Sequence, residues 1–373
     1  IVSTMYRQMK LLTFYRCGSR PFWFVKSFLS SCSANRLHDY DTDLNTLHTP
    51  VMVNEILQYL KPKANGFYLD MTFGAGGHTK ALLSKEASIT VVTLDRDPSS
   101  VSLAQQLSNV SNSTVIPLEG KFSQLNDLLM EINMEGAIFD GIIMDLGASS
   151  MQLTSSERGF SLVSDGPLDM RMTPTDKITA EDVLKFASEE DLARIIKCYG
   201  EEKYAKKIAR CVWETRYRLS PLKTTHQLAE LVSSMTGSNY YPDKVGRPAH
   251  VATRTFQALR IFVNDELNEI EKGIKAAHNC LKPGGRLAVL SFHSLEDRIV
   301  KELFHCFDTD SKAFKNLQSS VTGLGSTPII KAFDEAKKKS WKQLHKHVIV
   351  PSESEVEENK RSRSAKLRVA VKT

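Results

Sequence analysis

The sequence predicts an α/β fold, a doubly wound parallel β-sheet with an inserted helical domain. Three observations predict it. An apolar run at residues 66–71 breaks into closely spaced glycines and then into helix-compatible residues, the pattern of the first β-loop-α unit of a nucleotide-binding sheet. Further strand-like runs alternate with helical segments, which implies parallel strands joined by helices. Between residues 152 and 248 the pattern is helical with no clear strand, and strand-like runs resume afterwards.

The glycine loop at residues 73–78 (FGAGGH) predicts a cofactor site. Glycine allows the backbone angles of a tight strand-to-helix turn, and it lets a ligand approach the main-chain N–H groups. The loop lacks the G-x-G-x-x-G spacing of dinucleotide folds, and an adenosyl ligand without a pyrophosphate needs less of an anion cradle. The loop therefore favours S-adenosylmethionine over NAD, although an NAD-dependent oxidoreductase stays an alternative.

The elements around this loop follow in order. Residues 51–60 predict a helix, and residues 89–95 predict a second buried strand that ends on Asp95. Asp95 lies about 20 residues beyond Gly74, the spacing at which a carboxylate can accept both ribose hydroxyl hydrogens. The alternative is that Asp95 caps the helix that begins near Pro98.

Two more strands complete the first part of the sheet. Residues 115–118 predict the third strand and residues 139–145 the fourth. In parallel α/β sheets, ligands bind beyond the carboxyl ends of the strands. The side chains that fall at or just after those ends are His78, Asp95, Phe122 and Asp145.

The remainder of the chain divides into an insertion and a second part of the sheet. Capping signals at residues 179–182 and 224–227 precede helix-spaced apolar residues. A long helix is expected from Thr253 to about Cys280, followed by a turn, a strand at 286–292, mostly irregular structure at 308–350 and a closing edge strand at 365–371. The expected parts are a leader (1–38), the first part of the core (47–151), a helical insertion (152–248) and the second part of the core (249–373).

Charge and composition separate the leader from the body. The chain has 373 residues, a formal charge of +6 and 41% hydrophobic residues, an ordinary value for a globular protein. Residues 1–38 hold six of the 49 basic residues and no acid, so the remaining 43 basic residues match the 43 acidic ones. Because the chain after residue 38 has no net charge, it could bind nucleic acid only through local basic patches. The leader resembles a mitochondrial transit peptide; a disordered tail or a gene-model artefact is the alternative.

Cysteine usage predicts a reducing compartment and no metal. The six cysteines are scattered singly, without a C-x-x-C pair or a Cys/His cluster at zinc-ligand spacing. No apolar run in the leader approaches the length of a membrane span, so no membrane partner is expected.

Longer sequence blocks carry a family resemblance. They lie at residues 70–79, 94–98, 144–150, 157–161, 165–172, 253–261 and 291–298, in an order that chance would hardly produce. These blocks resemble the MraW/RsmH family, which methylates N4 of a cytidine in small-subunit ribosomal RNA. The resemblance implies a class I, Rossmann-like methyltransferase fold, S-adenosylmethionine as cofactor, and rRNA or the assembling small subunit as partner. Together with the leader, it implies a location in the mitochondrial matrix.

The resemblance also implies cofactor contacts at matching positions. These are Gly76, Gly77 and His78 in the glycine loop, Asp95 for the ribose, Phe122 beside the adenine, and Asp145 and Gln152 near the methionine end. Taken alone, Phe122 would be an ordinary core residue and His78 a helix-start or core histidine.

The expected chemistry is attack by an exocyclic amine on a methyl group. Cytosine N4 is a poor nucleophile, so the site needs an acceptor that orients the N–H and tolerates developing positive charge. Asp145 at a strand end suits this role, and His293 is a second candidate or a structural residue. Many amino-methyltransferases have Asp/Asn-Pro-Pro-aromatic here, whereas residues 145–148 are DLGA. A carbon-5 methyltransferase would need a cysteine near the fourth strand, and none lies there.

A basic stripe and an alternative function remain open. One side of a predicted helix carries four basic residues, Lys203, Lys206, Lys207 and Arg210. This side either contacts RNA or is merely a solvated face. The alternative to an enzyme is a ribosome-assembly factor that acts mainly by binding, with methylation secondary.

Overall fold

The computed structural model describes residues 50–306 and 341–373, apart from 112, 137, 219–220, 237–239 and 243–247. The described chain forms two compact units, residues 50–149 with 266–373, and residues 150–265. The expected leader (1–38) lies outside the described residues. In the part described, every helix falls short of the length and apolar character that crossing a bilayer demands.

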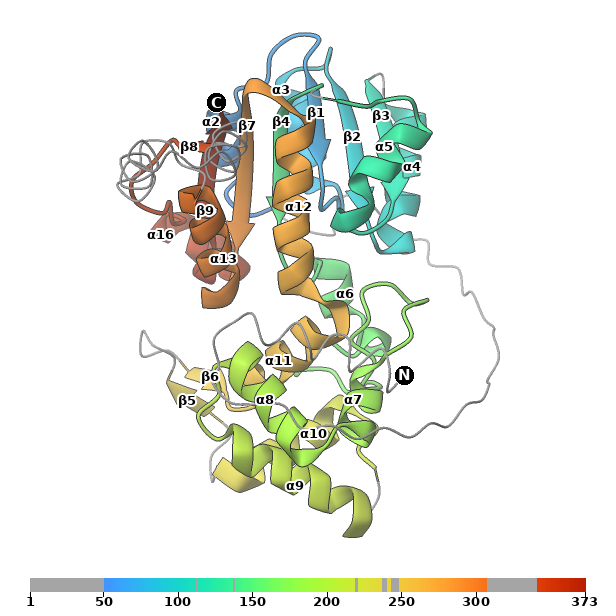
Figure 1. Ribbon diagram of the computed structural model, residues 1–373, viewed down its shortest axis with the longest axis vertical. Coiled ribbons are helices and arrows are strands. Elements are labelled where there is room, and N and C mark those ends of the chain that lie inside the picture. The colour runs from blue at the N-terminus through green and yellow to red at the C-terminus, as the bar shows by residue number, and fades with distance from the viewer. Residues whose placement is uncertain are drawn as a thin grey trace, which may run out of the picture. The chain divides into compact units, whose positions relative to one another are not determined.

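The first unit contains a seven-stranded sheet in the order β3-β2-β1-β4-β7-β9-β8 (Figure 1). Neighbouring strands from β3 to β7 are parallel, whereas β9 runs antiparallel to both β7 and β8. Five parallel strands with a reversed strand beside them confirm the predicted α/β sheet. The strands are β1 (Phe67–Asp70), β2 (Thr90–Asp95), β3 (Thr114–Glu119), β4 (Phe139–Asp145), β7 (Leu281–Ser291), β8 (Trp341–Gln343) and β9 (Lys366–Lys372).

Helices cover both faces of this sheet, as a doubly wound fold requires. On β4, Ile143 belongs to a buried cluster with residues of α2 and α3, whereas the next residue, Met144, faces Gly273 of α12. Successive strand residues point to opposite faces, so the two contacts identify two covered faces. The helices of this unit are α2 (Val53–Leu60), α3 (Gly77–Lys85), α4 (Pro98–Val110), α5 (Leu125–Glu131), α12 (Glu266–Cys280), α13 (Ser294–Cys306) and α16 (Glu353–Glu358), with 3-10 turns η1 (Phe122–Gln124) and η3 (Lys360–Ser364).

The closing strand is where the structure departs from the sequence prediction. The expected strand at 365–371 forms as β9, but it is not at the edge, because β8 pairs with its outer side. β8 lies within the segment expected to be mostly irregular, of which residues 308–340 are outside the described residues. A three-residue strand is too short to produce a readable alternation, and its Trp341 is buried against Phe304 and His278.

The second unit is mainly helical, as predicted for the insertion. Its helices are α6 (Ser150–Thr154), η2 (Ser156–Arg158), α7 (Ala180–Phe186), α8 (Glu189–Gly200), α9 (Ala205–Arg218), α10 (Thr225–Thr236) and α11 (Thr253–Asn264). The expectation of no strand there was wrong, because β5 (Tyr240–Pro242) pairs antiparallel with β6 (Pro248–His250). The unit extends beyond residue 248 because α11 packs against α8.

The long helix expected from Thr253 to about Cys280 is two helices. Asp265 adopts a left-handed conformation with φ of 53°, and its N–H bonds to carbonyls near the end of α11. A residue in this conformation terminates an α-helix. The apolar periodicity continues on both sides of Asp265, which is why the break was not visible in the sequence.

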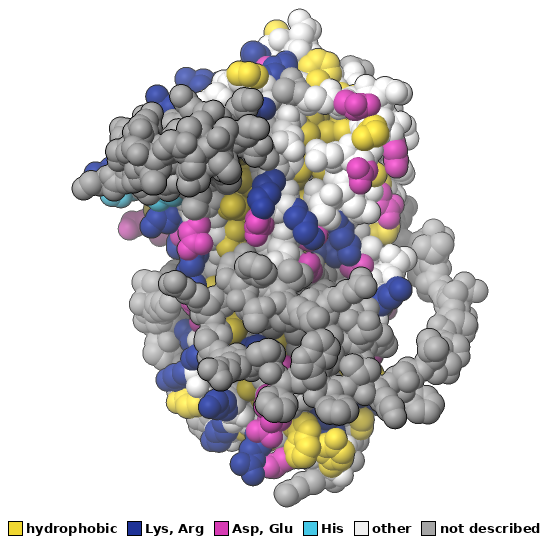
Figure 2. All heavy atoms as spheres, viewed as in Figure 1, with side chains coloured by type: hydrophobic (Ala, Val, Ile, Leu, Met, Phe, Trp, Pro, Cys, Tyr) yellow, Lys and Arg dark blue, Asp and Glu magenta, His cyan; other side chains and the backbone are white. Residues whose placement is uncertain are grey.

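Charges of both signs share the surface. In Figure 2, both Lys and Arg side chains and Asp and Glu side chains lie on the face shown. This agrees with the equal numbers of basic and acidic residues outside the leader.

Gly200 provides a test of the packing between α8 and α11. A Cβ there would lie 2.5 Å from the backbone oxygen of Arg254, so Gly200→Ala should force the helices apart and lower the free energy of unfolding by about 1–3 kcal/mol. Thermal and urea unfolding measure the effect. Lys197→Ala on the exposed side of α8 is the control, and equal stability of the two variants would contradict the close packing.

Candidate active site

The glycine loop connects β1 to α3 by a tight turn. Gly74 and Gly76 have φ of 53° and 79°, a region that favours glycine, and Gly76 is the N-cap of α3. A Cβ on Gly77 would lie 2.8 Å from the ring of Pro50. The loop therefore requires glycine at three positions, and its turn leads directly to the N-terminus of a helix, where backbone N–H groups are available to a ligand.

Asp95 ends β2 beside this loop. Its Oδ2 accepts the Gly74 N–H at 2.8 Å, and its Oδ1 accepts the Asp97 N–H at 2.9 Å. Burial raises the pKa of Asp95 to about 6, although both backbone hydrogen bonds oppose the shift. The helix cap is Asp97, whose side chain accepts from Ser99 N, so the alternative reading of Asp95 as that cap was wrong.

Three titratable side chains meet at the ends of β1 and β4 and the start of α3. Asp70 is fully buried and accepts hydrogen bonds from Thr72 N at 3.1 Å and Thr79 Oγ1 at 2.7 Å. His78 Nε2 lies 3.4 Å from Asp145 Oδ2, and the Asp145 N–H donates to Thr72 Oγ1 at 2.7 Å. The sequence predicted His78 and Asp145 as site residues, and the structure brings them together.

Burial and charge act in opposite directions on this cluster. Burial disfavours the imidazolium of His78, but the carboxylates of Asp145 and Asp70 outweigh it and raise the pKa of His78 above its usual value. Burial also raises the pKa of Asp70, against the opposing influence of His78. Oδ1 of Asp145 is buried without a hydrogen-bond partner in the described part of the chain. This atom can accept a hydrogen from a bound molecule.

Phe122 lies in η1, after β3, and is half-buried. Gly273 of α12 makes room for it, because a Cβ on Gly273 would lie 2.9 Å from the Phe122 Cβ. Glu269, one turn earlier on α12, accepts the N–H of Ser123 at 3.0 Å and so fixes the turn that carries the ring. Gln152 is buried in α6, in the other unit, and its predicted cofactor contact stays a prediction.

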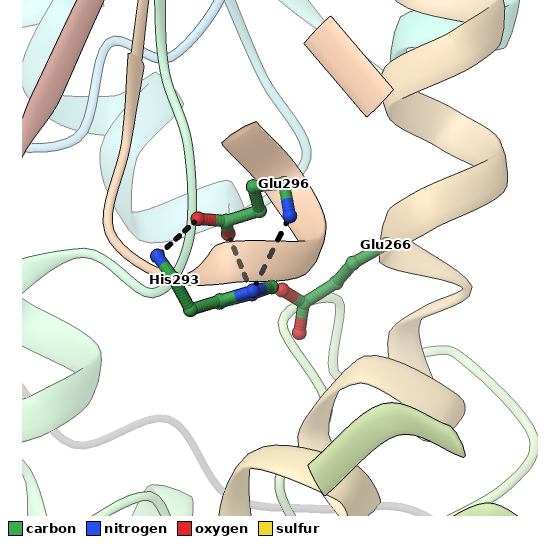
Figure 3. Close-up of side chains that lie close together, drawn as sticks. All are labelled: Glu266, His293 and Glu296. Carbon is green, nitrogen blue, oxygen red and sulfur yellow. Dashed lines mark hydrogen bonds and ion pairs between the residues drawn. The ribbon is translucent and has the colours of Figure 1, made fainter. Parts of the chain in front are cut away.

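His293 follows β7 and begins α13 in the arrangement drawn in Figure 3. Its Nδ1 accepts the Glu296 N–H at 3.3 Å, and Glu296 Oε2 accepts the N–H of Phe292 at 2.7 Å and of His293 at 3.2 Å. This reciprocal pattern is a capping box in which histidine occupies the N-cap position. Leu290 is paired with Asp145, so the two candidate residues follow neighbouring strands at the same sheet edge.

Glu266 joins His293 and Glu296 in a cluster whose ligand atoms lie within 4.8 Å of one another. His293 Nε2 is 3.0 Å from Glu296 Oε1, and Figure 3 shows the Glu266 carboxylate beside the same ring. Because Nδ1 accepts a backbone N–H, the neutral ring carries its hydrogen on Nε2. That nitrogen therefore faces the carboxylates as a donor and offers no lone pair to a cation in this tautomer.

Comparison with known proteins decides the family. The sequence matches the MraW methylase family over residues 45–373. The chain belongs to the MraW methylase family. A human protein named 12S rRNA N(4)-cytidine methyltransferase METTL15 is 45% identical over 356 residues, which cover 91% of this chain and 87% of that protein. A Drosophila melanogaster protein named probable methyltransferase-like protein 15 homolog is 47% identical over 332 residues, covering 87% of this chain and 92% of that protein.

Two other matches cover a small part of the matched protein or have low sequence identity. A Culex quinquefasciatus protein named putative receptor-type tyrosine-protein phosphatase mosPTP-1 is 47% identical over 329 residues, but this chain spans 22% of its length. A solved rRNA methylase from Streptococcus thermophilus is 11% identical with a TM-score of 0.31, over 86% of this chain and 94% of that one. The strand order β3-β2-β1-β4-β7-β9-β8, with β9 antiparallel to its neighbours, gives this MraW family member the class I methyltransferase fold.

A methylase of this family uses S-adenosylmethionine, and the site fits it. The glycine turn leaves the N-terminus of α3 open to a ligand, and each Asp95 oxygen, having accepted one N–H, has a further lone pair for a ribose hydroxyl. The half-buried ring of Phe122 suits packing against an adenine, and the expected cofactor contacts of Phe122 and Asp145 stay predictions.

Sequence reasoning assigned no role to several residues that support this site. Asp70 accepts a hydrogen bond from Thr79, the residue after His78, and Thr72 accepts the N–H of Asp145. Glu269 accepts the N–H of Ser123, and Gly273 leaves room for Phe122. Asp70 could have been found in the sequence as an acid at the end of an apolar run. Glu296 could have been found as an acid three residues after His293, the spacing of a capping box. Glu269 and Gly273 lie about 150 residues from Phe122 in the sequence and carry no local signal.

We predict that the affinity for the cofactor depends on pH through the ionisation of Asp95. The ribose hydroxyls bind the carboxylate form, so affinity should fall as pH falls through about 6. Between pH 7.5 and 5.5 we expect a loss of about fourfold, from the ionised fraction at the two values. Titration calorimetry with S-adenosylmethionine measures it. The Asp95→Asn variant should bind the cofactor more weakly at both pH values and should lose the fourfold dependence on pH. If that variant keeps the same pH dependence, the titrating group is His78.

Gly273→Ala tests the support of Phe122. Alanine normally favours a helix over glycine, but here its Cβ displaces Phe122 and should weaken S-adenosylmethionine binding about tenfold. Lys275→Ala, exposed on the same helix, should leave the affinity unchanged. If calorimetry gives the wild-type affinity for Gly273→Ala, the predicted contact between Phe122 and the cofactor is refuted.

Proposed function

We propose that this protein methylates N4 of a cytidine in mitochondrial small-subunit (12S) rRNA. The observation that carries the proposal is Asp145, a carboxylate at the end of β4 with one buried oxygen lacking a hydrogen-bond partner among the described residues, on the sheet edge that carries the glycine loop and Asp95. Relatives at 45% identity are named for 12S rRNA N(4)-cytidine methylation, which supports the same substrate for this chain.

The residues of the site suit an amine acceptor. Bound S-adenosylmethionine supplies an electrophilic methyl group. The lone pair of cytosine N4 is delocalised into the ring, so Asp145 has to accept an N–H and orient the nitrogen. When the nitrogen gains its methyl group it becomes cationic, and the Asp145 carboxylate takes up the proton that leaves. Thr72 fixes the backbone of Asp145, and His78 holds its other oxygen.

His293 is the second candidate acceptor. Its Nδ1 already accepts the Glu296 N–H, so its neutral form has no vacant lone pair. It can take up a proton only if the capping hydrogen bond opens. We therefore infer that Asp145 is the first acceptor and that His293 holds the start of α13.

The partner and the location follow from the proposed substrate. We infer that the protein acts on small-subunit rRNA, or on the assembling small ribosomal subunit, in the mitochondrial matrix, and that methylation supports small-subunit assembly. Access to N4 requires the target cytidine to be single-stranded or flipped out. Nucleoside mass spectrometry of small-subunit rRNA after incubation with the protein and labelled S-adenosylmethionine tests the assignment. A product at carbon 5, at a ribose hydroxyl or on adenine would overturn it.

Two substitutions separate the candidate acceptors. Asp145→Asn should reduce the rate of N4 methylation at least about 100-fold, because the amide cannot take up the proton. His293→Asn should stay within a few-fold of the wild type, since asparagine is also a good N-cap. Single-turnover rates and melting temperatures are compared for both. A 100-fold loss in His293→Asn at unchanged melting temperature would transfer the role to His293.

A further inference from the structure

Helix α9 has one buried and one exposed side. Ala205, Ile208, Ala209 and Val212 are buried, and α9 contacts α8, α10 and α7. These residues recur at helical spacing and fix which side of α9 faces solvent. The predicted basic residues Lys203, Lys206, Lys207 and Arg210 are all exposed, although Lys203 precedes the first turn.

The exposed side carries a line of four side chains, here called the α9 stripe: Lys206, Arg210, Trp213 and Tyr217. They occupy positions i, i+4, i+7 and i+11 and therefore lie one above the other along one side of the helix. The stripe is about 16 Å long, from the rise per residue. Figure 1 places α9 at the lower end of the view, where Figure 2 shows dark-blue, magenta and yellow side chains.

The aromatic half of the stripe is not part of the core. Trp213 is 38% exposed and Tyr217 is 74% exposed, with their ring centroids 4.9 Å apart and their planes inclined by 57°. A pair of contacting aromatic side chains on the solvent side of an amphipathic helix gains only a few tenths of a kcal/mol from the pairing itself. Exposed aromatic groups of this kind indicate a binding surface.

The charged half selects the chemistry of the partner. Lys206 and Arg210 continue the line of the aromatic rings, and Lys207 and Lys203 flank it. Arg210 contacts Glu214 at 3.0 Å but remains 71% exposed, so its guanidinium can still reach a phosphate. Tryptophan, tyrosine and arginine are also frequent in protein interfaces, but lysine is depleted there, and the stripe with its flanks carries three lysines. Cations beside exposed aromatic rings are typical of surfaces that bind single-stranded nucleic acid.

We propose that the α9 stripe binds single-stranded RNA. Trp213 and Tyr217 stack on bases, and Lys206 and Arg210 contact the phosphates that follow. Aromatic stacking tolerates any base, so the stripe supplies affinity rather than sequence selection. The inference rests on the proposed function only in taking RNA as the partner, and it extends that function by naming a contact surface within the helical unit.

Stacking is tested by substitutions that keep or remove the rings. The full chain is titrated into a fluorescent single-stranded RNA of 12 nucleotides, about the span of such sites, and anisotropy gives the affinity. Trp213→Leu and Tyr217→Leu should each weaken binding about 5- to 100-fold. Trp213→Phe and Tyr217→Phe should restore most of it, because phenylalanine still stacks. Val163→Ala, at an 89% exposed residue of the same unit, is the control.

The phosphate contacts are tested by salt dependence. Lys206→Gln and Arg210→Gln should each reduce the slope of log affinity against log salt by about 0.7, the value for single strands. Unchanged affinity of the leucine variants at wild-type melting temperature would overturn the proposal and leave the stripe to a protein partner. Cofactor calorimetry and nucleoside analysis of the wild type report on the proposed function separately. Suppose that the leucine variants lose RNA affinity while the wild-type protein methylates another nucleoside. That result would refute N4 methylation and leave the RNA-binding role of the α9 stripe standing.

Discussion

The hydrogen bond from Gly74 N–H to Asp95 Oδ2 ties the glycine loop to the end of the second strand. The loop can close this tightly only because Gly74 and Gly76 adopt positive φ angles. Its closure places His78 in the first turn of α3, against Asp145 at the end of β4. One turn thus positions the helix N-terminus, His78 against the carboxylate of the proposed chemistry, and Asp95, which we predict to bind the ribose.

That arrangement requires charges to be buried close together. Asp70, His78 and Asp145 carry two carboxylates around one imidazole, and the raised pKa of His78 shows that the carboxylates favour its charged form despite burial. Hydrogen bonds from Thr72 N–H and Thr79 Oγ1 further satisfy Asp70. Buried charges persist in proteins when they are paired and hydrogen-bonded in this way. The residues that make the site polar are therefore also the residues that hold its geometry.

The sequence predicted the parts of this structure that local patterns encode. Strand-like runs, closely spaced glycines and acids at strand ends identified β1, β2 and β4 and placed Asp95 and Asp145 at one sheet edge. Features that depend on distant residues were not predictable. Asp265 divides one continuous apolar pattern into two helices, and Gly273 accommodates Phe122 although the two lie far apart in the chain. β8 becomes the edge strand because it pairs with β9, not because of its own sequence.

The two candidate histidines, His78 and His293, differ in how the contacts of their ring nitrogens leave them able to accept a proton. Nε2 of His78 lies 3.4 Å from Asp145 Oδ2, and the raised pKa of His78 favours the imidazolium, whose charge balances that of Asp145. His293 instead uses Nδ1 to cap α13, which fixes its hydrogen on Nε2. An imidazolium has no lone pair, and the capping imidazole of His293 has none to spare. Neither histidine is therefore ready to accept a proton, which supports the proposal that Asp145 is the acceptor.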